Sequence, residues 1–337
     1  MGILAQTMPT LLELVNSLNP DGSEAEIAEV LTQHTEVLDD MTWMNGNKTT
    51  GHIDSYRTVL PEPQYRAINE GVGYSKGASA QMEESTAMLE DWSKCDRELA
   101  LLSGNVEAYR LKEAHPHLIG FAHKMARDVF YGNANVDPKA FTGLAPRYWT
   151  LDKAKSATAE NVIDADGTGT GLRSIWVVGW GHHTITGLVP KNSVGGLQHE
   201  DMTNDPKGTK LYDDQGRPYV GYEDHWTWRC GMFVKDWRYA VRVANIDVDL
   251  LTKDASSGPD LIYYLTEAVE RIEGTAGVKA AIYVPRTIRT WLRHQTKNAK
   301  NVMLSLDQVA GKEVLNWDGI PIRRTDALNV EETEVVA

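Results

Sequence analysis

The sequence has few of the residues that define several protein classes. Only two of its 337 residues are cysteine, Cys95 and Cys230, and they lie far apart and outside CxxC spacing. We therefore expect two buried free thiols rather than a disulfide framework or a zinc ribbon. Cations are scarce too. The 34 Lys and Arg against 47 Asp and Glu give a net charge of −13, which argues against a protein built mainly to bind duplex nucleic acid or anionic lipid.

Long apolar runs are missing as well. No stretch approaches the roughly eighteen apolar residues of a membrane-spanning helix. Residues 1–18 lack the basic start of a signal peptide, so we expect neither secretion nor a membrane anchor. The shares of apolar (42%) and charged (24%) residues are ordinary and indicate a globular chain with a sizeable core.

Common catalytic motifs do not occur. The sequence has no HExxH zinc signature, no GxSxG nucleophile elbow and no GK[ST] phosphate loop. Residues 164–171 (DADGTGTG) are Gly-rich, but a strand pattern rather than a helix follows them, and Ile175 stands where a calcium loop needs glutamate. We predict a flexible loop tip there, and no catalytic, cofactor-binding or metal-binding residues in the chain.

Histidine supplies the first alternative, a metal-dependent hydrolase. His182 and His183 are adjacent, so on the strand that we predict for this region they point to opposite faces and cannot share one ion without distortion. Packing or polar roles are therefore favoured over a metal site. The candidate ligands of this alternative are His182, His183, His199 and His225.

Tryptophan supplies the second alternative, a carbohydrate-binding protein. The chain holds ten Trp, and Trp226, Trp228 and Trp237 fall in the β-rich part, where they would line a sugar platform. Aromatic side chains in such segments are more often core or interface residues, which is the interpretation that we favour.

The first hundred residues predict an arm and a hairpin. Two amphipathic helices are indicated at 11–18 and 23–38, with little core of their own. Residues 49–60 predict a strand, and the polar, Gly-rich stretch at 61–79 is too long for a loop inside a compact domain. The pattern of residues 80–90 fits a helix and a strand equally well.

The middle of the chain predicts helices. Residues 96–131 are mainly helical, with a break at Pro116 and a left-handed stop at Gly132. Strands are then predicted at 174–180, 183–190, 216–223 and 236–247.

The last third combines helices, a strand and a tail, which makes the fold class α+β. We expect the acidic tail, residues 331–337, to be frayed. The basic spots are Arg286, Arg289, Arg293, Lys297 and Lys300 along the helix that follows Pro285, and Arg323 with Arg324 near the end of the chain. For the helix, ion pairs with the acidic surface of a neighbour are favoured over a solvated basic face. The predicted elements are a helix from residue 260 to 273 that stops at Gly274, a strand at 279–284 and a helix from Pro285.

Six segments, in this order and spacing, resemble the major capsid proteins of tailed bacteriophages, the Hong Kong 97-type fold, and most closely the podovirus-like branch. The segments are YRTVLPEPQYRAINEG (56–71), LEDWSKCDRELALLSGN (89–105), FYGNANVDPKAFTGLAPRY (130–148), SIWVVGWG (174–181), RCGMFVKDWRYAVRVANID (229–247) and WDGIPIRRTDAL (317–328).

The resemblance implies a division of the chain. Its extended E-loop is a two-stranded ribbon that lies on a neighbouring subunit, which favours a strand at 80–90. The implied parts are an N-arm (1–45), the E-loop (46–95), a peripheral domain with the spine helix (96–150, with a return strand at 229–250) and an axial domain with the C-terminal segment (151–228 and 251–337).

The resemblance also implies a role. The chain would be a non-enzymatic structural protein without cofactors that self-assembles, as hexamers and pentamers, into an icosahedral shell around double-stranded DNA. A portal and a scaffolding or cement protein would be its partners, and assembly would take place in the host bacterial cytoplasm. One variant of the family cross-links itself through lysine; Lys48 and Lys76 lie in the corresponding segment, but nothing identifies their partners.

Overall fold

The computed structural model describes residues 36–203, 208–213, 215–252, 258–275, 277–298, 304–309 and 312–337. The helix predicted at 11–18, and residues 23–35 of the helix predicted at 23–38, lie outside the described residues. The described chain forms two compact units. The first holds Met88–Met125 and Val194–Arg229, and the second holds the residues up to Ala87, Ala126–Ser193 and Cys230–Ala337. Among the described residues, none of the helices is long and apolar enough to span a membrane.

A mixed β-sheet forms the centre of the second unit. Neighbouring strands are parallel in the pairs β11–β14 and β4–β10 and antiparallel in the pairs β5–β11 and β5–β10. The strand order is β14 (Ile320–Arg324), β11 (Lys279–Val284), β5 (Leu172–Trp180), β10 (Ala240–Asp247) and β4 (Val162–Asp164).

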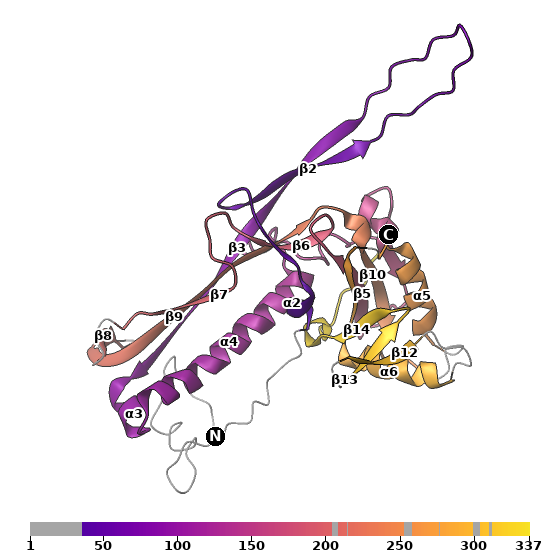
Figure 1. Ribbon diagram of the computed structural model, residues 1–337. Coiled ribbons are helices and arrows are strands. Elements are labelled where there is room, and N and C mark those ends of the chain that lie inside the picture. The colour runs from indigo at the N-terminus through magenta and orange to yellow at the C-terminus, as the bar shows by residue number, and fades with distance from the viewer. Residues whose placement is uncertain are drawn as a thin grey trace. The chain divides into compact units, whose positions relative to one another are not determined.

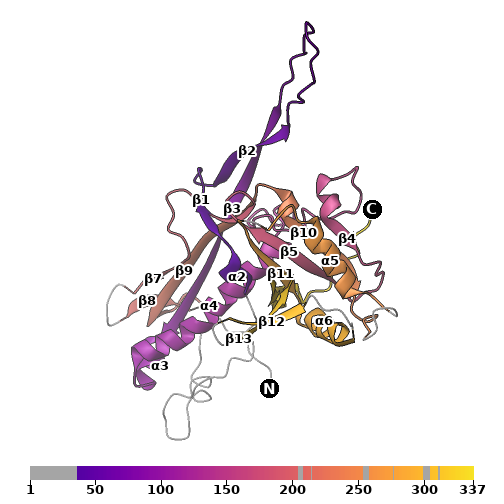
Figure 2. The same cartoon turned by 45° about the vertical axis from the view of Figure 1, so that its right-hand side comes forward.

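Both faces of this sheet are buried, which the near-continuous apolar strands predict. Ile175 and Val177 of β5 belong to a core cluster with the helices α5 (Leu261–Arg271) and α6 (Arg286–Asn298). Trp176, between them, points to the other face, where its ring meets Phe130 and Tyr148. Figure 2 shows α5 and α6 beside the sheet.

The two helices begin where the sequence predicts. The side chain of Asp260 accepts hydrogen bonds from the backbone N–H groups of Ile262 and Tyr263, both at 3.1 Å, and so caps α5. α5 ends at Arg271, before the predicted stop at Gly274, and α6 follows Pro285 directly.

Shorter elements complete the second unit. β6 pairs with β1 in parallel, and β13 joins β12 and β14 in an antiparallel ribbon. These elements are α2 (Val37–Asp40), β1 (Trp43–Asn45), η1 (Ala157–Asn161), β6 (Ile185–Val189), η2 (Trp237–Tyr239), β12 (Leu304–Val309), β13 (Lys312–Trp317) and η4 (Asp326–Leu328).

The C-terminal tail is not frayed, so that prediction was wrong. Val335 is buried, and its backbone N–H and C=O both bond to the side-chain amide of Asn245 at 2.8 Å. The Glu332 side chain enters the core, where it meets Arg242. An acidic tail is expected to be solvated, but the contacts with Asn245 and Arg242 outweigh that tendency.

The first unit combines helices with the ends of two long strands. β9 pairs with β7 and β8 in antiparallel fashion, and Cys95, Leu99 and Tyr109 lie in its core. Cys95, and Cys230 of the second unit, are both buried and form no disulfide, as predicted. The elements are α3 (Arg97–Leu102), β7 (Leu197–Asp201), β8 (Thr209–Tyr212) and parts of β3 (Ala78–Asp96), α4 (Val106–Tyr131) and β9 (Pro218–Val234).

Two predictions about α4 need correction. Pro116 lies inside one continuous helix of 26 residues rather than between two helices. Proline removes one backbone hydrogen bond, and the buried side chains of Tyr109 and Phe121, on either side of it, hold the helix together. Gly132 does end the helix, but not through a left-handed conformation. A β-carbon there would lie 2.6 Å from the carbonyl oxygens of Asp128 and Phe141, so close backbone packing requires glycine.

Candidate assembly surface

The candidate site is a long hairpin formed by β2 (Gly51–Val59) and the first half of β3. Antiparallel pairing runs from Gly51 opposite Ser85 to Val59 opposite Ala78. The strand at 49–60 and the strand alternative for 80–90 are therefore confirmed. Residues 60–77, here called the tip, extend beyond the ends of both strands (Figure 1).

Hydrogen bonds organise the start of the hairpin. The Asn47 side chain donates to the carbonyl of Ile53 at 2.5 Å and accepts from its N–H at 2.8 Å, closing a small loop before β2. His52 is buried and meets the ring of Phe233 edge-on at 4.8 Å. The base of the hairpin is therefore packed against the second unit.

Ion pairs hold the same end of the hairpin. Arg147 forms a two-pronged pair with Glu84, at 2.5 and 2.8 Å, and both side chains are largely buried. Lys235 bonds to Asp54 at 2.5 Å, and this hydrogen bond lowers the pKa of the Asp54 carboxyl. We call the Arg147–Glu84 and Lys235–Asp54 pairs the root of the hairpin.

The tip presents large apolar side chains to solvent. Tyr65 and Tyr74 are fully exposed, Ile68 is 91% exposed and Leu60 is 71% exposed. The tip has no helix or strand, and among the described residues its backbone carries a hydrogen bond from the N–H of Glu70 to the carbonyl of Ala67. Exposed apolar side chains gathered on one projecting segment mark a surface that a partner covers.

The comparison with known proteins decides the family. The family model for major capsid protein GP7 matches residues 19–336. This chain belongs to that family. It is a major capsid protein of the tailed-bacteriophage type, and its function is to build a phage capsid shell.

Solved structures agree. A chain in the structure of bacteriophage Epsilon15 is similar over 99% of both chains, with 31% sequence identity and a TM-score of 0.74. A chain of the bacteriophage JBD30 capsid shares the fold at a TM-score of 0.52 and 12% identity, over 89% of this chain and 93% of that one. No curated protein sequence matches. The Hong Kong 97-type α+β fold of this major capsid protein is thus confirmed.

The histidines of the hydrolase alternative do not form a metal site. His182 and His183 lie in an exposed turn between β5 and β6, so the strand predicted at 183–190 begins at Ile185 and neither histidine is part of it. His199 bonds to Asp224 at 2.9 Å and His225 to Glu90 at 2.6 Å, both in the first unit. Within the described ranges there is no group of three or more residues placed to hold a metal ion.

The tryptophan platform is not supported either. Trp226 is only 2% exposed, and the imidazole rings of His117 and His199 stack on it at 5.0 and 5.2 Å. Trp237 belongs to the second unit, where it begins η2. Trp226 is therefore a core residue of the first unit.

Several other candidate positions have local partners. The Gly-rich loop at 164–171 is tied down where the N–H of Gly167 bonds to the carbonyl of Asn245 at 3.0 Å. Lys48 pairs with Glu83 on the hairpin at 2.7 Å. At the basic spot near the end of the chain, Arg323 and Arg324 bind Asp40 and Asp326 of the same chain.

Sequence reasoning found the hairpin but missed its root. Glu84 and Arg147 are 63 residues apart, and nothing local in either segment indicates the pair. The tip had a detectable signal, since Tyr65, Ile68 and Tyr74 are large apolar residues in an otherwise polar, Gly-rich stretch.

Proposed function

We propose that the hairpin, residues 46–95, is an intersubunit clamp in a non-enzymatic shell. The observation that carries this proposal is the tip, where Tyr65, Ile68 and Tyr74 have no cover within the described chain. The proposal extends to the rest of the chain: residues 1–45 as N-arm, 96–150 with 229–250 as peripheral domain, and 151–228 with 251–337 as axial domain and C-terminal segment.

The energetics of the hairpin suit a clamp. Burial of one large apolar side chain contributes about 1.5–3 kcal/mol, so the exposed side chains of the tip can supply several kcal/mol per contact before the entropy cost of ordering the tip is subtracted. The root pairs fix the direction in which β2 and β3 leave the second unit. Because the root fixes the direction of the hairpin and the tip presents apolar side chains, each subunit can make the same weak contact, and the free energies of many such contacts sum over the shell.

The partners follow from the same role. Many copies of the chain form the shell, and we propose that they do so as hexamers and pentamers, with a portal and a scaffolding or cement protein, in the host bacterial cytoplasm and in a podovirus-like particle. The net charge of −13 supports a shell that encloses DNA without binding it tightly. The free subunit should therefore retain no DNA in a gel shift at physiological salt.

The experiment removes the tip in two ways. Deletion of residues 64–78, or the milder triple variant Y65S/I68S/Y74S, should leave a soluble, folded subunit that forms no stable particles. The control V136S/L250S removes two exposed apolar side chains outside the hairpin and should assemble normally. Size exclusion and electron microscopy give the readout. Normal shells from the deletion variant would reject the clamp.

A further inference from the structure

The helix α6 carries its arginines on one face. Arg286, Arg289 and Arg293 follow an i, i+3, i+7 spacing, which places them on the same side of a helix. Ile288 and Leu292, by contrast, belong to the core cluster that α6 shares with the sheet. The helix sequence, RTIRTWLRHQTKN, contains no acidic residue. We call Arg286, Arg289 and Arg293 the arginine face.

The arginine face is short of negative charge. Arg286 lies 3.6 Å from the Asp326 carboxylate, beyond the length of a normal hydrogen bond. Arg293 is exposed and forms no ion pair among the described residues. The Nε of Arg289 is buried and makes no hydrogen bond within the described part of the chain. Burial and the charge of Arg293 lower the pKa of Arg289, and the carboxylate of Glu36 offsets only part of this shift. Because a buried guanidinium nitrogen without an acceptor is costly, the face favours an anionic partner.

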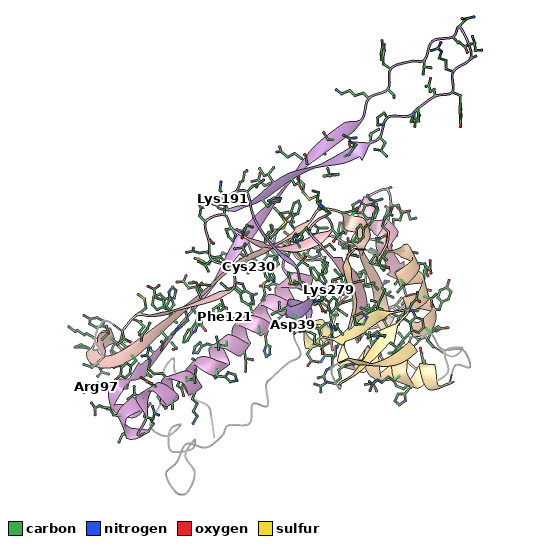
Figure 3. The ribbon with its side chains drawn as sticks, in the orientation of Figure 1. Asp39, Arg97, Phe121, Lys191, Cys230 and Lys279 are labelled. Atoms are coloured by element: carbon green, nitrogen blue, oxygen red, sulfur yellow. The ribbon has the colours of Figure 1, made fainter. Side chains whose placement is uncertain are left out.

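Two other cations on the same side of the sheet are already paired. Lys279 of β11 donates to the backbone carbonyl of Asp39 at 2.8 Å, and Figure 3 labels both residues. The Asp40 carboxylate lies 3.1 Å from Lys279 and 3.1 Å from Arg323 of β14. Contacts with α2 therefore neutralise the charges of these two strands, and they do not extend to the arginine face.

Negative charge gathers on the other side of the central strand β5. Ala244 of β10 pairs with Asp164 of β4. The loop that follows β4 returns to the end of β10, where the N–H of Val248 donates to the carbonyl of Gly171 at 3.4 Å. These backbone contacts bring four carboxyl side chains to one edge of the sheet. We call them the acidic edge: Asp164, Asp166, Asp247 and Asp249.

The acidic edge has no counter-charge among the described residues. Its carboxylates form no ion pair there and belong to no group placed to hold a metal ion. Asp166 and Asp249 are exposed. Burial, together with the charges of Asp166 and Asp164, raises the pKa of Tyr264, which shows that α5 borders the edge. The segments that form or border the edge hold seven acidic residues and no Lys, Arg or His: residues 162–171, 244–252 and 258–270.

The two surfaces face away from the middle of the sheet in different directions. Both belong to the second unit. β11 and β14 follow on one side of β5, and β10 and β4 follow on the other. β14 and β4 are four strand spacings apart, which is about 19 Å. One subunit therefore presents opposite charges at two separate places, and this arrangement suits a contact between identical copies.

We propose that the arginine face of one subunit binds the acidic edge of a second copy of this chain. A contact between two different surfaces is head-to-tail, and it repeats into a closed ring when the rotation between copies closes. The inference rests on the proposed function, in which hexamers and pentamers build the shell. It names the surfaces through which the copies of one ring meet, whereas the hairpin is the clamp between subunits.

Charge reversal of the full-length subunit tests the arginine face. R286E/R293E should raise the subunit concentration needed for rings by about tenfold, the effect of losing two or three exposed ion pairs. Native mass spectrometry counts the subunits in each ring. The control K139E/K191E changes the net charge equally at two exposed lysines of the second unit and should form rings like the original protein. If R286E/R293E does not fold, R286Q/R293Q should show a smaller rise.

Reversal of the acidic edge gives the matching variant. D166N/T168R/T170R/D249R makes the edge basic and should impair rings as R286E/R293E does. Asparagine is chosen at residue 166 because Asp166 has a backbone φ of 57°, which asparagine tolerates. Thr168 and Thr170 are exposed in the loop after β4. Ring formation that is unchanged in both variants would overturn the proposal.

A mixture of the two variants gives a sharper result. R286E/R293E subunits carry acid on both surfaces, and D166N/T168R/T170R/D249R subunits carry base on both. Mixed in equal amounts, they should form rings at a lower concentration than either variant alone. These rings should have six members and not five, because strict alternation cannot close around an odd number. Pentamers from the mixture, or no rings beyond those of the separate variants, would contradict the contact.

Disulfide trapping in assembled shells provides an independent readout. On oxidation D249C/R293C should give a ladder of cross-linked oligomers that ends at closed rings, and neither D249C nor R293C alone should give it. Burial raises the pKa of Cys95 to about 11 and that of Cys230 to about 12, so the native thiols compete little. An intrachain disulfide, or dimers without larger species, would overturn the head-to-tail contact.

The clamp and the ring contact can fail separately. Shells of D249C/R293C without a ladder would reject the ring contact and leave the clamp untouched. Normal shells after deletion of residues 64–78 would reject the clamp and leave the ring contact untouched. DNA retention by the free subunit that R286E/R293E abolishes would assign the arginine face to nucleic acid and overturn this proposal.

Discussion

Arg242 and Glu332 form a buried ion pair across 90 residues of sequence. Nη2 of Arg242 lies 2.5 Å from Oε2 of Glu332, and the side chains are 5% and 6% exposed. The same carboxylate accepts hydrogen bonds from Ser174 and Tyr131, both at 2.5 Å, and Arg242 also donates to the carbonyl of Tyr148 at 2.8 Å. The pair therefore ties the C-terminal tail to the face of the sheet opposite α5 and α6.

Removing one partner of this pair should lower the free energy of unfolding far more than removing both. E332Q leaves Arg242 buried without a counter-charge, and we expect it to lower the free energy of unfolding by about 3–5 kcal/mol. R242M/E332L replaces both residues with apolar ones, and its free energy of unfolding should be closer to that of the original protein. E334Q, on an exposed neighbour in the tail, is the control. Denaturant unfolding of the subunit measures all three, and equal stability of E332Q and E334Q would contradict a buried pair.

Asp40 should behave as the anchor of α2 on the sheet. Its carboxylate accepts from Arg323, from Lys279 at 3.1 Å and from the Tyr283 hydroxyl at 3.0 Å. Burial and the charge of Asp40 raise the pKa of Tyr283, which therefore stays a neutral donor. D40N should cost about 3 kcal/mol of unfolding free energy, whereas D39N, one residue away and exposed, should cost little. A thermal melt of D40N equal to that of D39N would refute the anchor.

Asp201 should make the first unit sensitive to acid. Burial opposes ionisation of this carboxyl, but the hydrogen bond from Arg110, at 2.9 Å, outweighs it and lowers the pKa to about 2. The unfolded value is about 3.9. The contribution of the Asp201 carboxylate to the free energy of unfolding is therefore complete above about pH 4 and disappears as the pH falls through 2.

The variant D201N separates this contribution from others. Because the Asp201 side chain is 46% exposed, solvent screening limits the loss at neutral pH to about 1 kcal/mol or less. The difference in unfolding free energy between D201N and the original protein should shrink between pH 4 and pH 2. A difference of constant size over this range would rule out Asp201 as its source.

His182 and His183 should be dispensable. Both side chains are exposed in the turn after β5, so H182Q/H183Q should shift the free energy of unfolding by no more than about 0.5 kcal/mol. Elemental analysis should find the same zinc content with and without the substitutions. Stoichiometric zinc that disappears in H182Q/H183Q would revive the hydrolase alternative.

Local patterns predicted many of the elements, and two of the misses share a cause. The apolar strand 174–180 and the Asp260 cap are determined by neighbouring residues, and both were confirmed. Pro116 and the tail near Glu332 were mispredicted because packing with distant segments outweighs local preference there, whereas at His182 and His183 an exposed turn delays the start of the predicted strand until Ile185. Residues 80–90 lay between these cases, because their two periodicities were balanced and only the pairing with β2 selects the strand.

The sequence by itself determined the α+β class, the absence of common catalytic motifs, the acidic charge and a projecting hairpin, because each depends on composition or on residues close together in the chain. Tertiary structure alone decided which charges are paired. The root pair Arg147–Glu84, the anchor Asp40–Arg323 and the core pair Arg242–Glu332 each join segments more than 60 residues apart. An ion pair of this kind depends on two side chains meeting in one low-dielectric place, and no local pattern specifies where the chain brings them together.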